Sequence, residues 1–201
     1  MSVKLVNKDC SDYDISNITF TNFNCKNPNI KKKEYCVDYS KPINNDKLSY
    51  ININHNNSQV VITTPEMVCP FGVNQQGSSF ILNLQFTNYK ENKEIQQIYD
   101  FINQLENKQI EHIGLDESNI DLYLSQIKRD KNKKYDPNLV IKIPFRYNKM
   151  DINCYNKEGD NINILNLSKF SKVKCDIYID KIWLFNEKYI CKWKLKTLYL
   201  R

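Results

Sequence analysis

The last third of the chain is a succession of strands separated by short turns, and this feature restricts the fold more than any other. Apolar residues alternate with polar ones from Leu139 to Tyr147, as in a strand with one buried face. Two hairpins are predicted to follow, each joined by a short polar turn: 151–156 with 161–167, and 173–185 with 189–200. Strands at this spacing favour a small barrel or a sandwich.

The middle of the chain adds a hairpin, a further strand and a helical segment. Residues 49–54 alternate, residues 56–58 are typical of a turn, and residues 59–63 are rich in β-branched side chains. This pattern predicts a hairpin. A strand with a clean period of two follows at 80–87, and the period then becomes helical.

The helical period predicts one or two helices inserted between strands. Asn88 and Glu91 have the chemistry of a capping box, and Gly114 can end the helix. Ser118 can cap a second, shorter helix. The chain is therefore expected to be mainly β, with a one- or two-helix segment inserted at about residues 88–129.

The N-terminal part of the chain is polar and lacks a regular period. Short strands are predicted there at Ile15–Phe20 and Tyr35–Tyr39. We interpret residues 1–47 as an extension packed on the barrel or loosely attached to it, and residues 48–201 as the folded domain. With 201 residues, of which 41% are hydrophobic, the chain has enough apolar surface for such a core.

Composition and motifs argue against several classes of protein. The first residues contain no apolar stretch of the signal-peptide type, and no segment is apolar enough to span a membrane. The seven cysteines are scattered without a C-x-x-C pair, so reduced thiols and no zinc site are expected. No catalytic motif is present, so neither an enzyme nor a cofactor is expected. Asp176 and Asp180 lie four residues apart on a predicted strand, about 13 Å, which is too far for one metal ion to bridge. They are therefore interpreted as a solvated strand edge.

The strand predicted near the C-terminus separates aromatic and apolar side chains from cations. Its apolar face carries Tyr189, Cys191, Trp193 and Leu195, and its polar face carries Lys192, Lys194 and Lys196. Lys142 and Arg146 repeat this arrangement on the strand at 139–147. Rows of cations suit nucleic-acid phosphates, and aromatic faces suit unpaired bases. The net charge of +6 and the basic stretch 128–134 favour binding, although a sheet can also place lysines on its wet face for solubility alone.

Short motifs along residues 48–200 resemble a known family. They are Ile62–Met67, Pro70–Val73, Tyr135–Pro137, Val140–Pro144, Ile182–Trp183 and Tyr189–Leu195. In this order they resemble the OB-fold single-stranded DNA-binding proteins of nucleocytoplasmic large DNA viruses, the giant viruses, which are distant relatives of the short-tailed coliphage protein.

The resemblance implies an OB-type barrel that coats DNA strands exposed during viral replication, recombination or repair, without catalysis. The loop of Pro65 and Gly72 and the hairpin from Trp183 to Trp193 would be signatures of the family. The phage relatives end in an acidic tail that recruits polymerase and helicase, whereas this chain ends in Thr197–Arg201. Recruitment through a tail is therefore in doubt.

The sequence thus predicts an OB-fold-like barrel that binds single-stranded DNA. The candidates for phosphate contacts are Lys142, Arg146, Lys192, Lys194 and Lys196, and the candidates for base stacking are Phe71, Tyr147, Tyr155 and Trp183. Further expected partners are viral replication proteins and a second copy of the chain, with no membrane contact. The expected location is the replication factory in the host cytoplasm, or the virion. Two alternatives stay open: a viral structural or scaffold β-sandwich, and a binder of single-stranded RNA.

Overall fold

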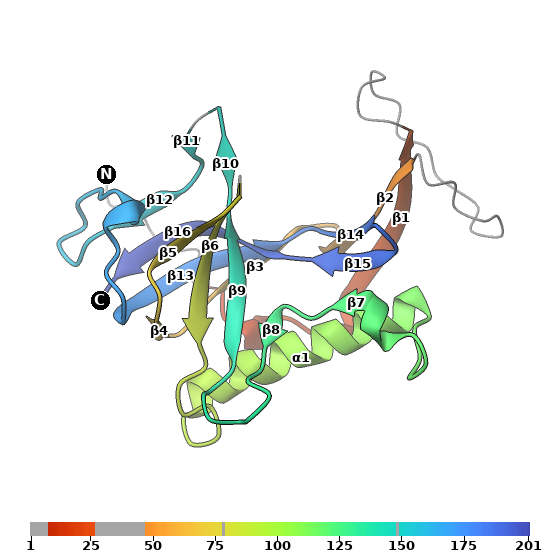
Figure 1. Ribbon diagram of the computed structural model, residues 1–201, viewed down its shortest axis with the longest axis horizontal. Coiled ribbons are helices and arrows are strands. Elements are labelled where there is room, and N and C mark those ends of the chain that lie inside the picture. The colour runs from red at the N-terminus through yellow and green to blue at the C-terminus, as the bar shows by residue number, and fades with distance from the viewer. Residues whose placement is uncertain (1–7, 27–46, 78, 148) are drawn as a thin grey trace.

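Five strands close a barrel. The computed structural model describes residues 8–26, 47–77, 79–147 and 149–201 (Figure 1). The first of these strands, which we call the first wall, is interrupted and consists of β3 (Val60–Thr63) and β4 (Met67–Cys69). The other four are continuous: β6 (Ser79–Gln85), β9 (Asn138–Ile143), β13 (Ser171–Ile179) and β16 (Trp193–Leu200). The ring runs β4–β6–β9–β16–β13 and back to β4, antiparallel throughout except for the parallel contact of β9 with β16. The predicted mainly-β, OB-fold-like barrel is confirmed.

The core of the barrel is formed by the alternate residues that the sequence pattern marked as apolar. Near the centre of the barrel, the inward-facing side chains of the strands are fully buried. They include Leu82, Leu84, Leu139, Ile141, Val173, Ile177, Trp193 and Leu195. The period of two therefore places one face of each strand in the core and leaves the other for the outer surface.

The first wall of the barrel is interrupted at Pro65, which has no N–H to donate to the sheet. Thr64 compensates, because its N–H donates to the Cys175 carbonyl and its hydroxyl accepts from the Cys175 N–H. After β4, Gly72 adopts a positive φ of 67°, and a Cβ there would lie 2.8 Å from the Leu167 carbonyl oxygen. The Pro65/Gly72 loop therefore has a direct structural role.

A second sheet extends from the barrel, and we call it the arm. Its order is β1 (Ile18–Lys26), β2 (Lys47–His55), β14 (Lys181–Phe185), β15 (Lys188–Cys191) and β7 (Tyr123–Leu124). The arm is a continuation of the barrel, because only Asp180 separates β13 from β14 and only Lys192 separates β15 from β16 (Figure 1). The predicted hairpin 173–185 with 189–200 is confirmed, and Asn186 and Glu187 turn it with positive φ.

The predicted hairpin between residues 49–54 and 59–63 is wrong. The chain does turn at Asn56 and Asn57, both with positive φ, but only the bridge from His55 to Ser58 closes the turn. β2 pairs with β14 in the arm, and β3 pairs with β13 in the barrel. Both halves of the predicted hairpin therefore pair with the long β13–β14 strand, and the turn connects them without pairing them to each other.

One helix, α1 (Lys93–Ile113), is inserted between β6 and β9 and lies below the barrel and arm in Figure 1. It begins later than predicted: Asn92 is the N-cap and accepts from Glu94 and Ile95, whereas Asn88 has a φ of 52°. Gly114 ends the helix in the left-handed conformation, as predicted. This helix is not apolar enough to cross a membrane, nor is any other in the part of the chain that the structure describes.

The second helix predicted after Ser118 is absent from the described residues. A single 3-10 turn (Ile120–Leu122) is followed by the short strands β7 and β8 (Ile127–Lys128). A buried carboxyl group on α1, that of Glu106, holds this segment by accepting from the Gln126 N–H at 2.6 Å and from the Ser125 hydroxyl at 2.9 Å. Burial raises the pKa of Glu106.

The N-terminal residues lie against the barrel and α1. Two 3-10 turns (Cys10–Asp12 and Ile15–Asn17) precede β1, and the strand predicted at Ile15–Phe20 begins only at Ile18. Tyr13 between them is buried, and its hydroxyl donates to the Val61 carbonyl at 2.7 Å. The strand predicted at Tyr35–Tyr39 lies outside the described residues.

The hairpin predicted from residues 151–156 and 161–167 forms only next to its turn, where the Asn156 N–H donates to the Asp160 carbonyl and the Ile162 N–H to the Cys154 carbonyl. β12 (Asn153–Tyr155) pairs in parallel with β16 in place of a hairpin partner, and a single bridge joins Tyr155 to Asn161. A 3-10 turn (Ile164–Asn166) follows. The remaining strands are short: β5 (Val73–Gln76) pairs with β6, and β10 (Phe145–Arg146) pairs with β11 (Lys149–Met150) in a separate two-stranded sheet.

Candidate nucleic-acid interface

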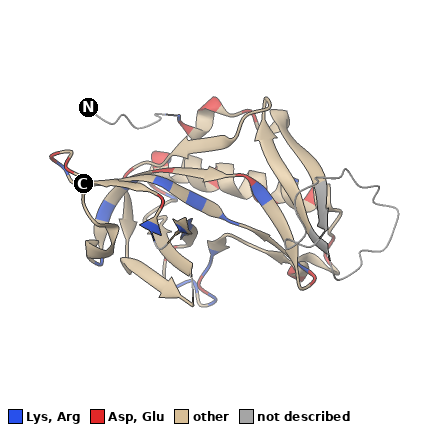
Figure 2. Ribbon diagram, turned by 90° about the horizontal axis from the view of Figure 1, so that it is seen from above, with Lys and Arg blue, Asp and Glu red and all other residues tan. Residues whose placement is uncertain are grey.

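A groove of about 320 Å³ lies where the outer wall of the barrel meets the arm, and we call it the cation groove. Four lysines and an aromatic hairpin meet there. The lining residues are Lys142, Lys181, Trp183, Leu184, Phe185, Ile190, Lys192 and Lys194. Seen from above, several Lys and Arg positions follow one another along the strands in the middle of the molecule (Figure 2).

Strand pairing explains why residues distant in sequence line one groove. The parallel register of β9 and β16 places Lys142 beside Lys194. On β14, Lys181 and Trp183 point to one face of the arm and Ile182 to the other, because side chains alternate along a strand. Lys192 stands at the junction of β15 and β16, where the chain passes from the arm to the barrel.

The lysines of the groove are close enough to affect one another. Burial, and next the charges of Lys192 and Lys194, lower the pKa of Lys142. Neither Lys142 nor Lys192 forms an ion pair with a described residue. Like charges held together in a partly dehydrated groove favour the binding of an anion, which relieves their repulsion.

Lys194 differs from its neighbours because it already has a carboxylate partner. Its Nζ lies 2.8 Å from both carboxylate oxygens of Asp180 and 5.6 Å from the centre of the Tyr178 ring. The interpretation of Asp176 and Asp180 as a solvated edge is therefore wrong: Asp176 is buried and accepts from the Thr63 hydroxyl at 2.6 Å.

Aromatic surface adjoins the cations at the hairpin of the arm. The side chain of Phe185 is 55% exposed at the hairpin tip. Trp183 is half-buried and packs against Tyr50, with ring centres 5.0 Å apart. Lys181 lies 4.0 Å from the centre of the Tyr50 ring and 5.6 Å from that of Trp183. The groove thus combines fixed positive charge with accessible aromatic faces.

The structure brings four of the nine predicted site residues together, since Lys142, Lys192, Lys194 and Trp183 all line the groove. The sequence did not single out Lys181 and Phe185, although both share the alternating face of Trp183. The alternation of these residues along the strand was the available signal. Lys196 is exposed further along β16, outside the groove lining.

Besides Lys196, the other four predicted site residues also lie outside the groove lining. Arg146 belongs to β10, and its charge acts on the hydroxyl of Tyr178. Tyr147 follows Arg146 with 97% of its surface exposed. Phe71 is exposed in the turn between β4 and β5. Tyr155 stacks on Tyr199 with ring centres 5.1 Å apart, so one of its faces is occupied.

No residue of the basic stretch 128–134 and no described cysteine lines the groove. Arg129 in that stretch donates to the Tyr99 hydroxyl on α1. Cys10, Cys69, Cys154, Cys175 and Cys191 are free thiols, and burial raises the pKa of Cys154 to about 11. The described part of the chain contains no group of three His, Cys, Asp or Glu side chains that could hold a metal ion.

No protein-family model matches this sequence, and no curated protein matches it either. Among solved structures, the chain is similar to the single-stranded DNA-binding protein from bacteriophage Enc34 in complex with ssDNA. The two share 11% identity and a TM-score of 0.48, over 81% of this chain and 93% of that chain. It is also similar to a single-stranded DNA-binding protein encoded by bacteriophage T7, with 11% identity and a TM-score of 0.39. That match covers 70% of this chain and 90% of the other. Both are phage proteins, so the giant-virus family predicted from the motifs has no match among them.

Proposed function

We propose that this protein binds single-stranded DNA in the cation groove, largely without sequence preference and without catalysis. The observation that carries the proposal is the convergence of four lysines, three on strands β9, β14 and β16 and one at the β15–β16 junction, beside the aromatic hairpin of β14 and β15. Lysines bind phosphates irrespective of the base sequence, and exposed aromatic rings stack on any base.

The aromatic part of the groove favours unpaired strands over duplex. Trp183 and Phe185 offer ring faces, but in a duplex the base faces are covered by their neighbours. The described groove contains no feature that reads the 2′-hydroxyl, so single-stranded RNA stays the alternative ligand. A role in viral replication, recombination or repair inside the host cell, and contacts with replication proteins, extend the proposal and stem from the resemblance in sequence motifs.

The direct test compares the affinity for an oligonucleotide of about 30 nucleotides with that for its duplex at equal salt. We expect tighter binding of the single strand. Equal or tighter binding of the duplex would refute the stacking part of the proposal. Absence of binding to either would favour the scaffold alternative.

The contribution of the groove is tested by its salt dependence. Replacing Lys142 and Lys192 by Gln removes two phosphate contacts, so the slope of log affinity against log salt should fall by about 1.4. The matched control replaces Lys131 and Lys133, two exposed lysines of the basic stretch 128–134, by Gln. If the control lowers the slope and the groove variant does not, the binding site lies at that stretch.

A further inference from the structure

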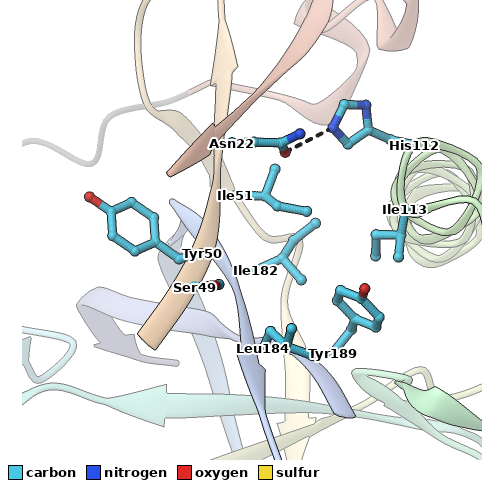
Figure 3. A pocket seen from close by; sticks show the side chains of 9 residues that line it. All are labelled: Asn22, Ser49, Tyr50, Ile51, His112, Ile113, Ile182, Leu184 and Tyr189. Atoms are coloured by element: carbon cyan, nitrogen blue, oxygen red, sulfur yellow. Dashed lines mark hydrogen bonds between the residues drawn. The ribbon is translucent and has the colours of Figure 1, made fainter. Parts of the chain in front are cut away.

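A second cavity, of about 270 Å³, lies between the arm and the C-terminal end of α1. Ile51 of β2 and Ile182 of β14 face it from the sheet, and Ile113 faces it from the helix (Figure 3). Since Ile182 and Trp183 are neighbours on one strand and point to opposite faces, this cavity lies behind the cation groove. We call it the rear cavity.

Polar side chains stand at the two ends of the rear cavity. At one end His112 stacks on Phe20, with ring centres 4.7 Å apart, and its Nε2 lies 3.2 Å from the Asn22 Oδ1 (Figure 3). This contact uses the carbonyl oxygen of Asn22, and the amide N–H₂ of Asn22 has no partner among the described residues. At the other end stands the Tyr189 hydroxyl, likewise without a partner in the described part of the chain.

We propose that the rear cavity binds a planar nitrogen heterocycle of nucleobase size, as in a free nucleoside. A cavity of about 150 Å³ lined by apolar side chains suffices for benzene, so the rear cavity admits a larger ring. Its isoleucine walls suit the two faces of a flat ring. The Asn22 amide donates at one edge, and the Tyr189 hydroxyl donates or accepts at the opposite edge.

The pattern of polar groups distinguishes this site from a mere gap in packing. Dry packing gaps are apolar, whereas binding pockets combine apolar walls with a few convergent polar groups. Hydrocarbons would leave both polar ends unpaired, which costs affinity. The heterocycle could also be a base of a bound DNA strand, although the sheet of the arm separates the cavity from the groove.

The test titrates adenosine and uridine into the isotope-labelled protein and follows backbone amide shifts by NMR. We expect saturable changes at Ile51, Ile113, Ile182 and Tyr189. Tyr189→Phe removes one hydrogen bond and should weaken binding about fivefold. Ile113→Trp fills the cavity and should abolish the changes. Unaltered shifts in the barrel would show that both variants fold.

Titrations with an oligonucleotide and with benzene show whether the bound ring is a free nucleoside or a base of a DNA strand, and whether the proposal fails. Changes caused by an oligonucleotide, together with weaker oligonucleotide binding by Ile113→Trp, would identify a base of the strand as the ligand. The proposal would be overturned if benzene bound with the same affinity as the nucleosides. It would also be overturned if neither the nucleosides nor the oligonucleotide changed the shifts at millimolar concentration. The salt slope of oligonucleotide binding reports on the cation groove separately, so either idea can fail alone.

Discussion

If the protein binds DNA as proposed, Asp180 competes with the phosphate for Lys194, and removing Asp180 should tighten binding. In the free protein both carboxylate oxygens of Asp180 lie 2.8 Å from the Lys194 Nζ. A phosphate entering the groove must displace this carboxylate or leave Lys194 unused. Asp180→Asn keeps the size of the side chain and the backbone carbonyl that accepts from the Ile53 N–H at 2.8 Å, but removes the competing charge.

The size of the effect follows from counterion release. Each phosphate contact to a single strand contributes a salt slope of about 0.7. One additional lysine contact should therefore steepen the slope by about 0.7 and raise affinity roughly fivefold in 0.1 M salt, since ten to the power 0.7 is about five. The two side chains of the pair are 24% and 26% exposed, so losing the pair should cost no more than about 1 kcal/mol of folding free energy.

Fluorescence anisotropy with a labelled oligonucleotide, repeated over a series of salt concentrations, measures both quantities. Glu187→Gln is the matched control, because it removes one exposed carboxylate from the same hairpin without freeing a lysine. The double variant Asp180→Asn/Lys194→Gln should lose the gain. An Asp180→Asn protein that melts normally but binds with unchanged slope would refute the competition, and an equal gain in the control would reduce it to net charge.

Three further outcomes are expected. Trp183→Ala should weaken single-strand binding by about 1–3 kcal/mol with an unchanged salt slope, since it removes a stacking face and no charge; a changed slope would contradict this. Glu106→Gln should make the protein more stable than the wild type at neutral pH. Because burial raises the pKa of Glu106, the stabilisation from its proton is complete below about pH 4.3 and is lost as pH rises through the folded pKa. The difference in urea unfolding free energy between Glu106→Gln and the wild type should therefore shrink toward pH 4. A difference that stays constant with pH would contradict this role of the Glu106 proton. Trp193→Ala should cost about 3–5 kcal/mol in the same urea assay, because Trp193 is fully buried; a loss below 1 kcal/mol would contradict that core role.

Local patterns were sufficient for the parts of the fold that depend on neighbouring residues. The alternation around Leu139 and Trp193 marked the buried faces correctly, since period two fixes which face a strand buries. Gly114 ended the helix where its left-handed conformation was needed. The lysine face opposite Trp193 was also predicted, because it follows from the same alternation.

Long-range pairing determined what the sequence could not show. The hairpin predicted around Asn56 had suitable turn chemistry, but β2 and β3 each gain a better partner in the long β13–β14 strand. Asn88 resembled an N-cap, yet its N–H donates to Asp136, far along the chain, and Asn92 caps instead. The alternation along β14 places Lys181 and Phe185 on the face of Trp183, but no local pattern shows that this face meets the barrel lysines in a groove.

The cation groove exists because two strands pass from the barrel into the arm at the same level. Asp180 is the single residue between β13 and β14, and Lys192 is the single residue between β15 and β16. Both residues therefore lie where a strand leaves the barrel sheet and joins the sheet of the arm. Both also contribute to the charge of the groove, Lys192 as a lining cation and Asp180 through its ion pair with Lys194. The barrel supplies Lys142 and the arm supplies Trp183, so neither sheet alone contains the site. Both sheets are consequently needed for the binding that we propose.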